Sequence, residues 1–273
     1  MTASPDAPVL HTTDVGDTGE RVVLLHGLFG QGRNFTQVAK ALSPELRSTL
    51  VDLPNHGRSA WTDDAGYEAV AETVADWMAA TYDAPVHLVG HSMGGKVAMV
   101  LAVTRPELVD RLVVVDIAPG PSDGASEFEH LLGSLAAIDL DGLGSRGDAD
   151  EQLAERVHDE RVRGFLLQNL RRGSDGWHWQ ANLDLLRDQL DRIGGFPHLD
   201  ASFDGPTLWV AGERSDYIGP EHEAEMHRLF PRVLSVTVKG AGHWVHSEQP
   251  EAFVSVLRTY LLADDRDLRR RGA

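Results

Sequence analysis

The sequence has no cysteine among its 273 residues, which excludes disulfide bonds, thiol nucleophiles and cysteine metal sites. Basic residues are also scarce, with 25 lysines and arginines against 42 aspartates and glutamates, a formal net charge of −17. A surface of that sign repels phosphate backbones and anionic lipids, so we expect no binding to nucleic acid or to membranes. No apolar run approaches the ~18 residues that span a bilayer.

The first ten residues, MTASPDAPVL, contain neither a basic region nor a long apolar stretch, so we expect no signal peptide. We therefore expect the protein to be cytoplasmic. With 42% hydrophobic residues, the chain can bury a large core. Its length suits one large α/β domain with an insertion, or two domains.

The most informative stretch is VHLVGHSMGGKVAMVLA, residues 86–102. A short apolar run typical of a buried strand leads directly into the G-x-S-x-G sequence of residues 90–94, and apolar residues at helical spacing follow. This order is typical of a nucleophile elbow, a sharp turn that presents a serine hydroxyl above the sheet. The turn crowds the positions two before and two after the serine, which explains the two glycines. The pattern therefore predicts Ser92 as a nucleophile.

A serine nucleophile needs a general base, and His243 is the best candidate among 13 histidines. It lies in a glycine-rich loop after the last predicted strand, which gives the order Ser, Asp, His known from one class of serine hydrolase. Two aspartates could orient it: Asp116 ends the strand RLVVVDI, and Asp216 follows the strand PTLWVA. We favour Asp116, because a buried aspartate without a partner is costly, and keep Asp216 as the alternative.

An acyl-transfer site also needs two hydrogen-bond donors for the oxyanion, each worth on the order of 3 kcal/mol in the transition state. The backbone amide of Met93, directly after the serine, is one expected donor. The second is the amide of Leu28, which follows His-Gly in the loop after the first predicted strand.

Buried strands are predicted along much of the chain, at 21–25, 48–53, 86–89, 111–117, 206–211 and 234–239. Helical spacing occurs between them and after the last one, at 34–42, 67–82 and 251–262. This alternation predicts an α/β fold with a mostly parallel central sheet and helices on both faces. The candidate groups fall just past strand ends, where such sheets bind ligands.

The pattern changes between residues 122 and 203, where apolar stripes at helical spacing occur without a convincing strand. We therefore expect an all-helical cap at 122–203, inserted between core segments 1–121 and 204–273. A substrate pocket would lie between core and cap. Its expected wall is apolar and largely aromatic, which suits an acyl or aryl group: Leu28, Phe29, Phe128, Leu132, Phe165, Trp177, Trp179, Tyr217 and Trp244.

Five motifs together resemble the α/β-hydrolase superfamily over nearly the whole chain, and within it the small YbfF-like bacterial carboxylesterases. They are H-G-L-F-G (26–30), D-L-P-N-H-G-R-S (52–59), G-H-S-M-G-G-K (90–96), V-D-I-A-P (115–119) and A-G-H-W-V-H (241–246). The resemblance implies a helical cap, activity on short acyl esters or acyl thioesters, the acid at Asp116 and an auxiliary serine at Ser215. Two residues depart from the pattern: Pro54, where arginine is common, and Asp216 directly after Ser215.

The expected function is that of a serine carboxylesterase, which hydrolyses short- to medium-chain acyl or aryl esters through an acyl-enzyme. The same catalytic triad could instead hydrolyse acyl thioesters or carbon–carbon bonds, or carry out perhydrolysis. A non-catalytic ligand receptor is a further alternative, disfavoured because both Ser92 and His243 are present. We expect no cofactor and no metal, a small-molecule ester as partner, and a monomer or small homo-oligomer.

Overall fold

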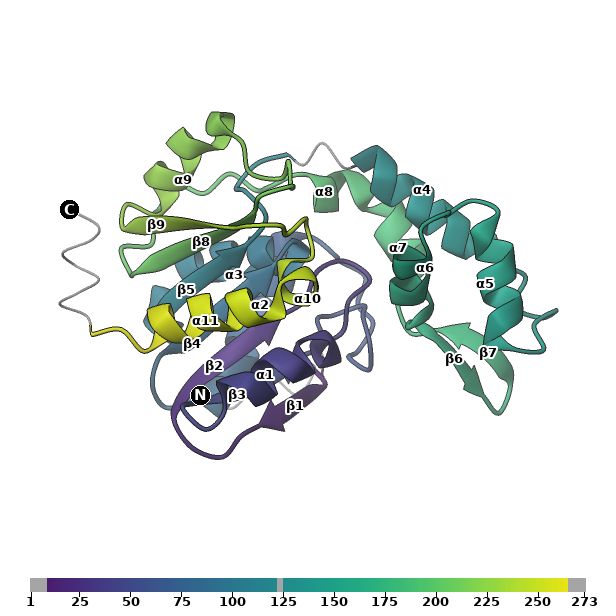
Figure 1. The fold of residues 1–273 in the computed structure, drawn as a ribbon, viewed down its shortest axis with the longest axis horizontal. Coiled ribbons are helices and arrows are strands. Elements are labelled where there is room, and N and C mark those ends of the chain that lie inside the picture. The colour runs from purple at the N-terminus through teal and green to yellow at the C-terminus, as the bar shows by residue number, and fades with distance from the viewer. Residues whose placement is uncertain (1–8, 122–124, 265–273) are drawn as a thin grey trace.

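A central sheet of seven strands forms the main body in a computed structural model of the chain, which describes residues 9–121 and 125–264 (Figure 1). The strands are β1 (Thr12–Val15), β2 (Glu20–Leu25), β3 (Leu46–Val51), β4 (Val86–His91), β5 (Val109–Val115), β8 (Thr207–Gly212) and β9 (Val233–Val238). Their order is β1-β3-β2-β4-β5-β8-β9. β1 runs antiparallel to β3 and the other neighbouring pairs are parallel, so the expected mostly parallel sheet is confirmed.

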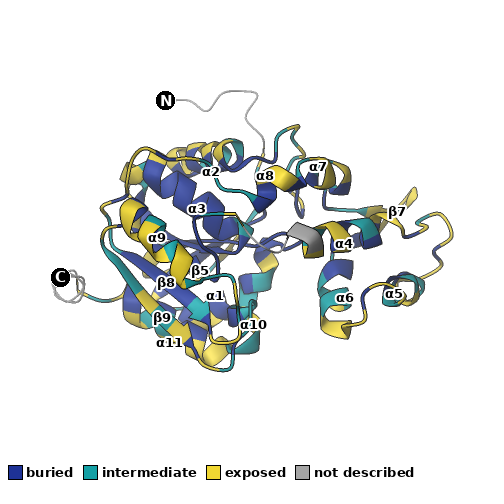
Figure 2. Ribbon diagram, turned by 90° about the horizontal axis from the view of Figure 1, so that it is seen from above, coloured by how far each residue is buried: buried dark blue, intermediate teal, exposed yellow. Residues whose placement is uncertain are grey.

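Helices cover both faces of the sheet. Successive strand residues point to opposite sides, and apolar residues on both sides have to be buried. In β2, Val22 and Leu24 pack on one face and Val23 and Leu25 on the other, and all four are fully buried. Helices α1 (Thr36–Leu42) and α11 (Pro250–Leu261) cover the first face, and α2 (Tyr67–Thr81), α3 (Met93–Thr104) and α9 (Glu223–Leu229) cover the second. Figure 2 shows that α3 is buried along most of its length. The short elements are η1 (Gly32–Phe35), η2 (Pro106–Leu108), η3 (Pro220–His222) and α10 (Val245–Glu248).

A long segment is inserted between β5 and β8, and it projects from the main body as a separate arm (Figure 1). We call its described part, residues 125–203, the insertion. It contains α4 (Ala125–Ala136), α5 (Arg146–Ala154), α6 (Glu160–Leu167), β6 (Leu170–Gly173), β7 (Gly176–Trp179), α7 (Leu183–Asp188) and α8 (Leu190–Gly194). An apolar cluster, which also includes Leu28, Phe29 and Ala65 of the main body, holds these elements together.

The expectation of an all-helical insertion is wrong at one place. Strands β6 and β7 pair antiparallel across the sequence Gly-Ser-Asp-Gly, residues 173–176. Gly176 has a φ of 114°, a conformation that favours glycine and lets the chain reverse tightly.

The expected boundaries of the cap stay a prediction. The first of them falls on residues 122–124, which lie outside the described residues. At the other end, Leu199 and Phe203 pack with the core of the main body rather than with the cluster of the insertion.

The segment just before α4 and the end of α8 meet at one side chain of the main body. Lys96 lies on α3, is 1% exposed, and donates from Nζ to the carbonyl oxygens of Gly120 (2.8 Å), Gly194 (3.1 Å) and Gly195 (2.7 Å). Burial lowers the pKa of Lys96 to about 7. The ammonium also lies 5.6 Å from the centre of the Tyr67 ring. The chain therefore leaves the main body and returns to it beside the helix that follows Ser92.

Candidate active site

Ser92 occupies a strained turn between β4 and α3. Its φ of 53° and ψ of −122° are unusual for a residue with a side chain. A Cβ atom at Gly90 would collide with the carbonyl oxygen of Gly94, and one at Gly94 would lie 2.5 Å from the carbonyl oxygen of His26. The two glycines thus allow strand, turn and helix to pack closely enough to form the turn.

His243 and Asp116 complete a hydrogen-bonded series with this serine. His243 Nε2 lies 3.0 Å from Ser92 Oγ, and its Nδ1 lies 2.8 Å from Asp116 Oδ2. The three residues follow β4, β5 and β9, so the parallel sheet brings their side chains to one edge. Ser92 is 4% exposed and the His243 side chain 16%.

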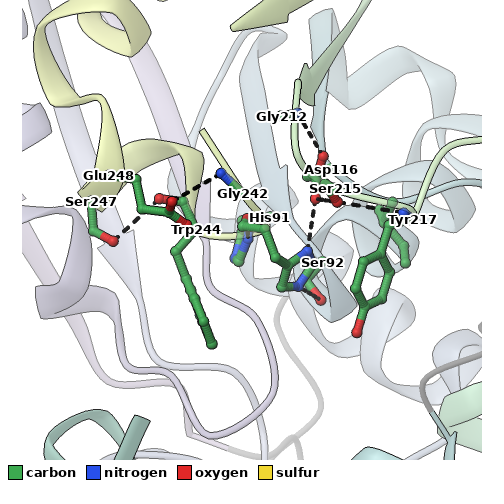
Figure 3. A network of polar contacts seen from close by, with 12 residues as sticks. His91, Ser92, Asp116, Gly212, Ser215, Tyr217, Gly242, Trp244, Ser247 and Glu248 are labelled. Carbon is green, nitrogen blue, oxygen red and sulfur yellow. Dashed lines mark hydrogen bonds and ion pairs between the residues drawn. The ribbon is translucent and has the colours of Figure 1, made fainter. Parts of the chain in front are cut away.

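Asp116 is completely buried and its orientation is fixed from several sides (Figure 3). Oδ1 accepts from the amide of Gly212 at 2.8 Å, and Oδ2 accepts from the hydroxyl of Ser215 as well as from the imidazole. The alternative acid, Asp216, is exposed and makes no hydrogen bond or ion pair with any other described residue. The geometry therefore favours Asp116 over Asp216 as the partner of His243.

The loop that carries His243 is anchored by groups that the sequence does not single out. His91 Nε2–H donates to the backbone carbonyl of His243 at 2.8 Å. Glu248 Oε2 accepts from the amide of Gly242 and from Arg214, each at 2.9 Å (Figure 3). Burial, with the nearby rings of His243 and His246, holds the pKa of His91 well below its usual range, so this ring stays neutral. Glycines make the loop before His243 flexible, so this loop needs side chains that hold its backbone in place. That requirement is the signal in the sequence that could have pointed to Glu248.

The face of the His243 imidazole is covered by an aromatic ring. Tyr217 stacks on His243 with 4.0 Å between ring centres and 21° between planes. Burial is the main cause that raises the pKa of Tyr217 to about 12, and the charges of Glu127 and Asp116 add to it. Tyr217 therefore stays neutral and restricts the tilt of the imidazole.

The two residues expected to supply the oxyanion hole, Leu28 and Met93, lie close to Ser92 in the fold or the chain. Leu28 lines the same cavity as Ser92, and Met93 is the first residue of α3. Neither amide donates to another residue of the described chain. The Leu28 loop is tied to the insertion, because Asn169 donates to the carbonyl of Phe29 at 2.7 Å.

A cavity of about 130 Å³ opens at Ser92, and the expected wall is largely present in it. Leu28, Phe29, Phe128, Phe165, Tyr217 and Trp244 line it as expected, and Leu131 and Val162 are additional.

Three expected wall residues do not line the cavity: Leu132, Trp177 and Trp179. Leu132 is 1% exposed and packs inside the insertion, because its neighbour Leu131 occupies the face of α4 toward the cavity. Trp177 and Trp179 share one face of β7 and pack against the same cluster. The Trp177 indole donates to the carbonyl of Leu143 at 3.0 Å, inside the insertion.

Across residues 9–121 and 125–264, no group of three or more histidine, aspartate or glutamate side chains could hold a metal ion. Within the same ranges, the helices are all too short or too polar to cross a bilayer.

A strand–serine–helix turn with its histidine and acid at the edge of a parallel sheet defines a class of hydrolase. The chain belongs to the α/β-hydrolase family, whose profile, described as alpha/beta hydrolase fold, matches residues 20–250. Among its relatives, the mouse sn-1-specific diacylglycerol lipase ABHD11 is 40% identical over 246 residues, which are 88% of this chain and 80% of the relative.

A bacterial relative and a solved structure agree with this family. The Escherichia coli esterase YbfF is 31% identical over 88% of this chain and 92% of its own length. A solved structure titled marine microorganism esterase is 34% identical, with a TM-score of 0.90 over 92% of this chain and 99% of the other. The expected α/β-hydrolase fold and the resemblance to YbfF-like esterases are therefore confirmed.

Proposed function

We propose that the protein is a serine carboxylesterase that hydrolyses short- to medium-chain acyl or aryl esters through an acyl-enzyme. The observation that carries this proposal is the series Ser92 Oγ, His243 Nε2 and Nδ1, Asp116 Oδ2, joined at 3.0 and 2.8 Å beside an apolar cavity. The names of the relatives, an esterase and a diacylglycerol lipase, support the same class of reaction.

In the first half of the reaction, the Ser92 hydroxyl attacks the ester carbonyl while His243 Nε2 takes its proton. Asp116 accepts the Nδ1–H bond, which holds the ring in the required tautomer and stabilises the imidazolium. The amides of Leu28 and Met93 would donate hydrogen bonds to the carbonyl oxygen and so stabilise the negative charge that develops on it. The imidazolium then gives its proton to the alkoxy oxygen as its bond to the acyl carbon breaks, which releases the alcohol and leaves the acyl-enzyme.

In the second half, water activated by His243 hydrolyses the acyl-enzyme and restores the Ser92 hydroxyl. Ser215 acts in this proposal as an auxiliary group, because its hydroxyl donates to the carboxylate oxygen that also faces the imidazole. We further propose a small-molecule ester as the substrate of a cytoplasmic monomer or small homo-oligomer.

The proposal is tested with p-nitrophenyl esters from acetate to palmitate and with a fluorophosphonate probe that labels activated serines. We expect hydrolysis with an optimum at short chains and labelling of Ser92. The Ser92→Ala variant should lose at least about a thousandfold in kcat, the scale of known triad deletions. Near-normal hydrolysis by Ser92→Ala, or the absence of labelling in the native protein, would contradict the proposal.

A further inference from the structure

A second cavity adjoins the one at Ser92 and is about four times larger, about 530 against about 130 Å³. The two share five lining residues, Asn34, Val162, Phe165, Trp244 and His246. We call the cavity at Ser92 the inner cavity and the larger one the outer cavity. Neither the proposed chemistry nor the similarity to other proteins gives the outer cavity a role.

Two aromatic side chains stand at the boundary between the cavities. Phe165 comes from α6 of the insertion and Trp244 from the main body, directly before α10. Their ring centres lie 6.0 Å apart with the planes tilted by 56°. Both rings line both cavities, so the boundary includes an aromatic side chain from each region of the molecule, beside the other three shared residues.

The chemistry of the site decides which part of an ester faces which cavity. When the tetrahedral intermediate collapses, the bond between the acyl carbon and the alkoxy oxygen breaks and His243 Nε2–H passes its proton to that oxygen. The alcohol must therefore lie on the side of His243. His243 itself lines the inner cavity, and its neighbours Gly242 and Trp244 line the outer cavity together with Ser247, so an alcohol that extends past His243 enters the outer cavity.

The acyl group then extends the other way, into the inner cavity. Leu28, Phe128 and Leu131 line that cavity and leave a small, largely apolar space. The carboxylate of Glu127 also lines it, which disfavours an acyl group with a second negative charge.

Charge in the outer cavity is balanced. Arg214 pairs with Glu248 at 2.9 Å, and Arg161 and Asp159 lie within one turn of each other at the start of α6. The remaining surface of the chain is acidic, with a net charge of −17. The outer cavity therefore favours an uncharged group over an anion.

We infer, building on the proposed esterase function, that the inner cavity holds the acyl group and the outer cavity holds the alcohol. The preferred substrates are then esters of short carboxylic acids with large, uncharged alcohols. Phe165 and Trp244 determine this specificity, since their rings separate the small inner cavity from the large outer cavity and so limit the length of the acyl chain.

The inference is tested with two isomeric esters, octyl acetate and ethyl octanoate, which differ in the side of the ester bond that carries the chain. We expect kcat/KM for octyl acetate to exceed that for ethyl octanoate by at least about tenfold, since lost methylene contacts in a pocket have effects of this size. An equal or reversed preference overturns the inference. So does hydrolysis of neither isomer by a protein that hydrolyses p-nitrophenyl acetate, whereas failure on p-nitrophenyl acetate as well would overturn the proposed function itself.

Removal of either ring should merge the two cavities. In Trp244→Ala, and independently in Phe165→Ala, we expect the ratio of the two kcat/KM values to fall toward one, mainly through a gain with ethyl octanoate. Trp61→Ala is the matched control, because Trp61 is 57% exposed and lines neither cavity. An unchanged ratio in both cavity variants, or the same fall in the control, overturns the assigned role of the rings.

Discussion

The main body and the insertion contribute different things to the same site. The main body supplies the hydrogen-bonded groups, namely Ser92, His243 and Asp116 at the ends of parallel strands. The insertion supplies mainly apolar surface, through residues such as Phe128 and Phe165. Reactivity therefore depends on the sheet, while the shape of the pocket depends on the packing of the insertion.

The two regions also differ in how their residues are held. In the main body, each oxygen of the Asp116 carboxylate accepts at least one hydrogen bond, and the backbone around His243 is anchored by His91 and Glu248. The insertion packs around an apolar cluster that also includes Leu28 and Phe29 of the main body, and polar contacts such as those of Lys96 and Asn169 join the two regions. A change in one region should therefore affect rate, and a change in the other should affect selectivity.

The largest expected effect tests whether the buried Asp116 is the acid that orients His243. Asp116→Asn keeps the shape of the side chain but replaces an acceptor oxygen facing His243, so the ring loses its stabilising charge. We expect kcat to fall by at least about a thousandfold, as for triad aspartates elsewhere. The matched control, Asp216→Asn, should stay within about twofold of the native enzyme, because an exposed side chain without a partner has little effect. A reversed result in a p-nitrophenyl acetate assay would make Asp216 the acid.

The next effect concerns the junction between the two regions. The pKa of Lys96 is about 7 in the folded chain and about 10.5 in the unfolded chain, so the unfolded chain binds more protons between these values. Raising the pH through this window therefore stabilises the native protein, whereas Lys96→Met lacks the titrating group. We compare the free energy of unfolding of the native protein with that of Lys96→Met. Above pH 7, we expect the native value to rise relative to that of the variant by about one kcal/mol per pH unit.

Urea unfolding at pH 7, 8 and 9 measures this shift, with Lys40→Met as the control at an exposed lysine of α1. The expectation fails if the stability of Lys96→Met follows that of the native protein in parallel across the series.

The smallest effect tests the auxiliary hydroxyl. Ser215→Ala removes one donor to Asp116 and leaves the bond between that carboxylate and His243 in place. A hydrogen bond to a charged group contributes about 1.5–3 kcal/mol, so we expect kcat to fall by about ten- to a hundredfold with little change in KM. Ser202→Ala, at an exposed serine far from the site in sequence, should behave like the native enzyme. Equal kcat values for both variants would show that Ser215 only completes a turn.

The sequence predicts the main body well, because strands buried on both faces are continuous apolar runs. The run predicted at 206–211 is observed at Thr207–Gly212, and the elbow glycines follow from a clash that any side chain would cause. Ser92, His243 and Asp116 are brought together as expected, and their catalytic roles stay predictions. β1 was not predicted, since its residues are half-exposed at the edge of the sheet and lack an apolar run.

The insertion was harder to predict, because its packing is set by contacts within a small irregular cluster. The hairpin of β6 and β7 contains charged residues, and its signal, Gly-Ser-Asp-Gly between alternating side chains, is weaker than three helical stripes. Spacing alone also could not decide whether Leu131 or Leu132 faces the cavity. A rotation of α4 by one residue exchanges them.

The contact of one ammonium group with the segment before α4 and with the end of α8 has a consequence for the evolution of such enzymes. The carbonyl oxygens of Gly120 and Gly194 both accept from Lys96 Nζ, so the chain that carries α4 to α8 starts and ends at nearly one point of the main body. Closing a loop between neighbouring points costs little more when the loop grows longer. Insertions of other lengths and sequences can therefore replace this one without moving a strand, and new substrate ranges can arise while the catalytic centre is inherited unchanged.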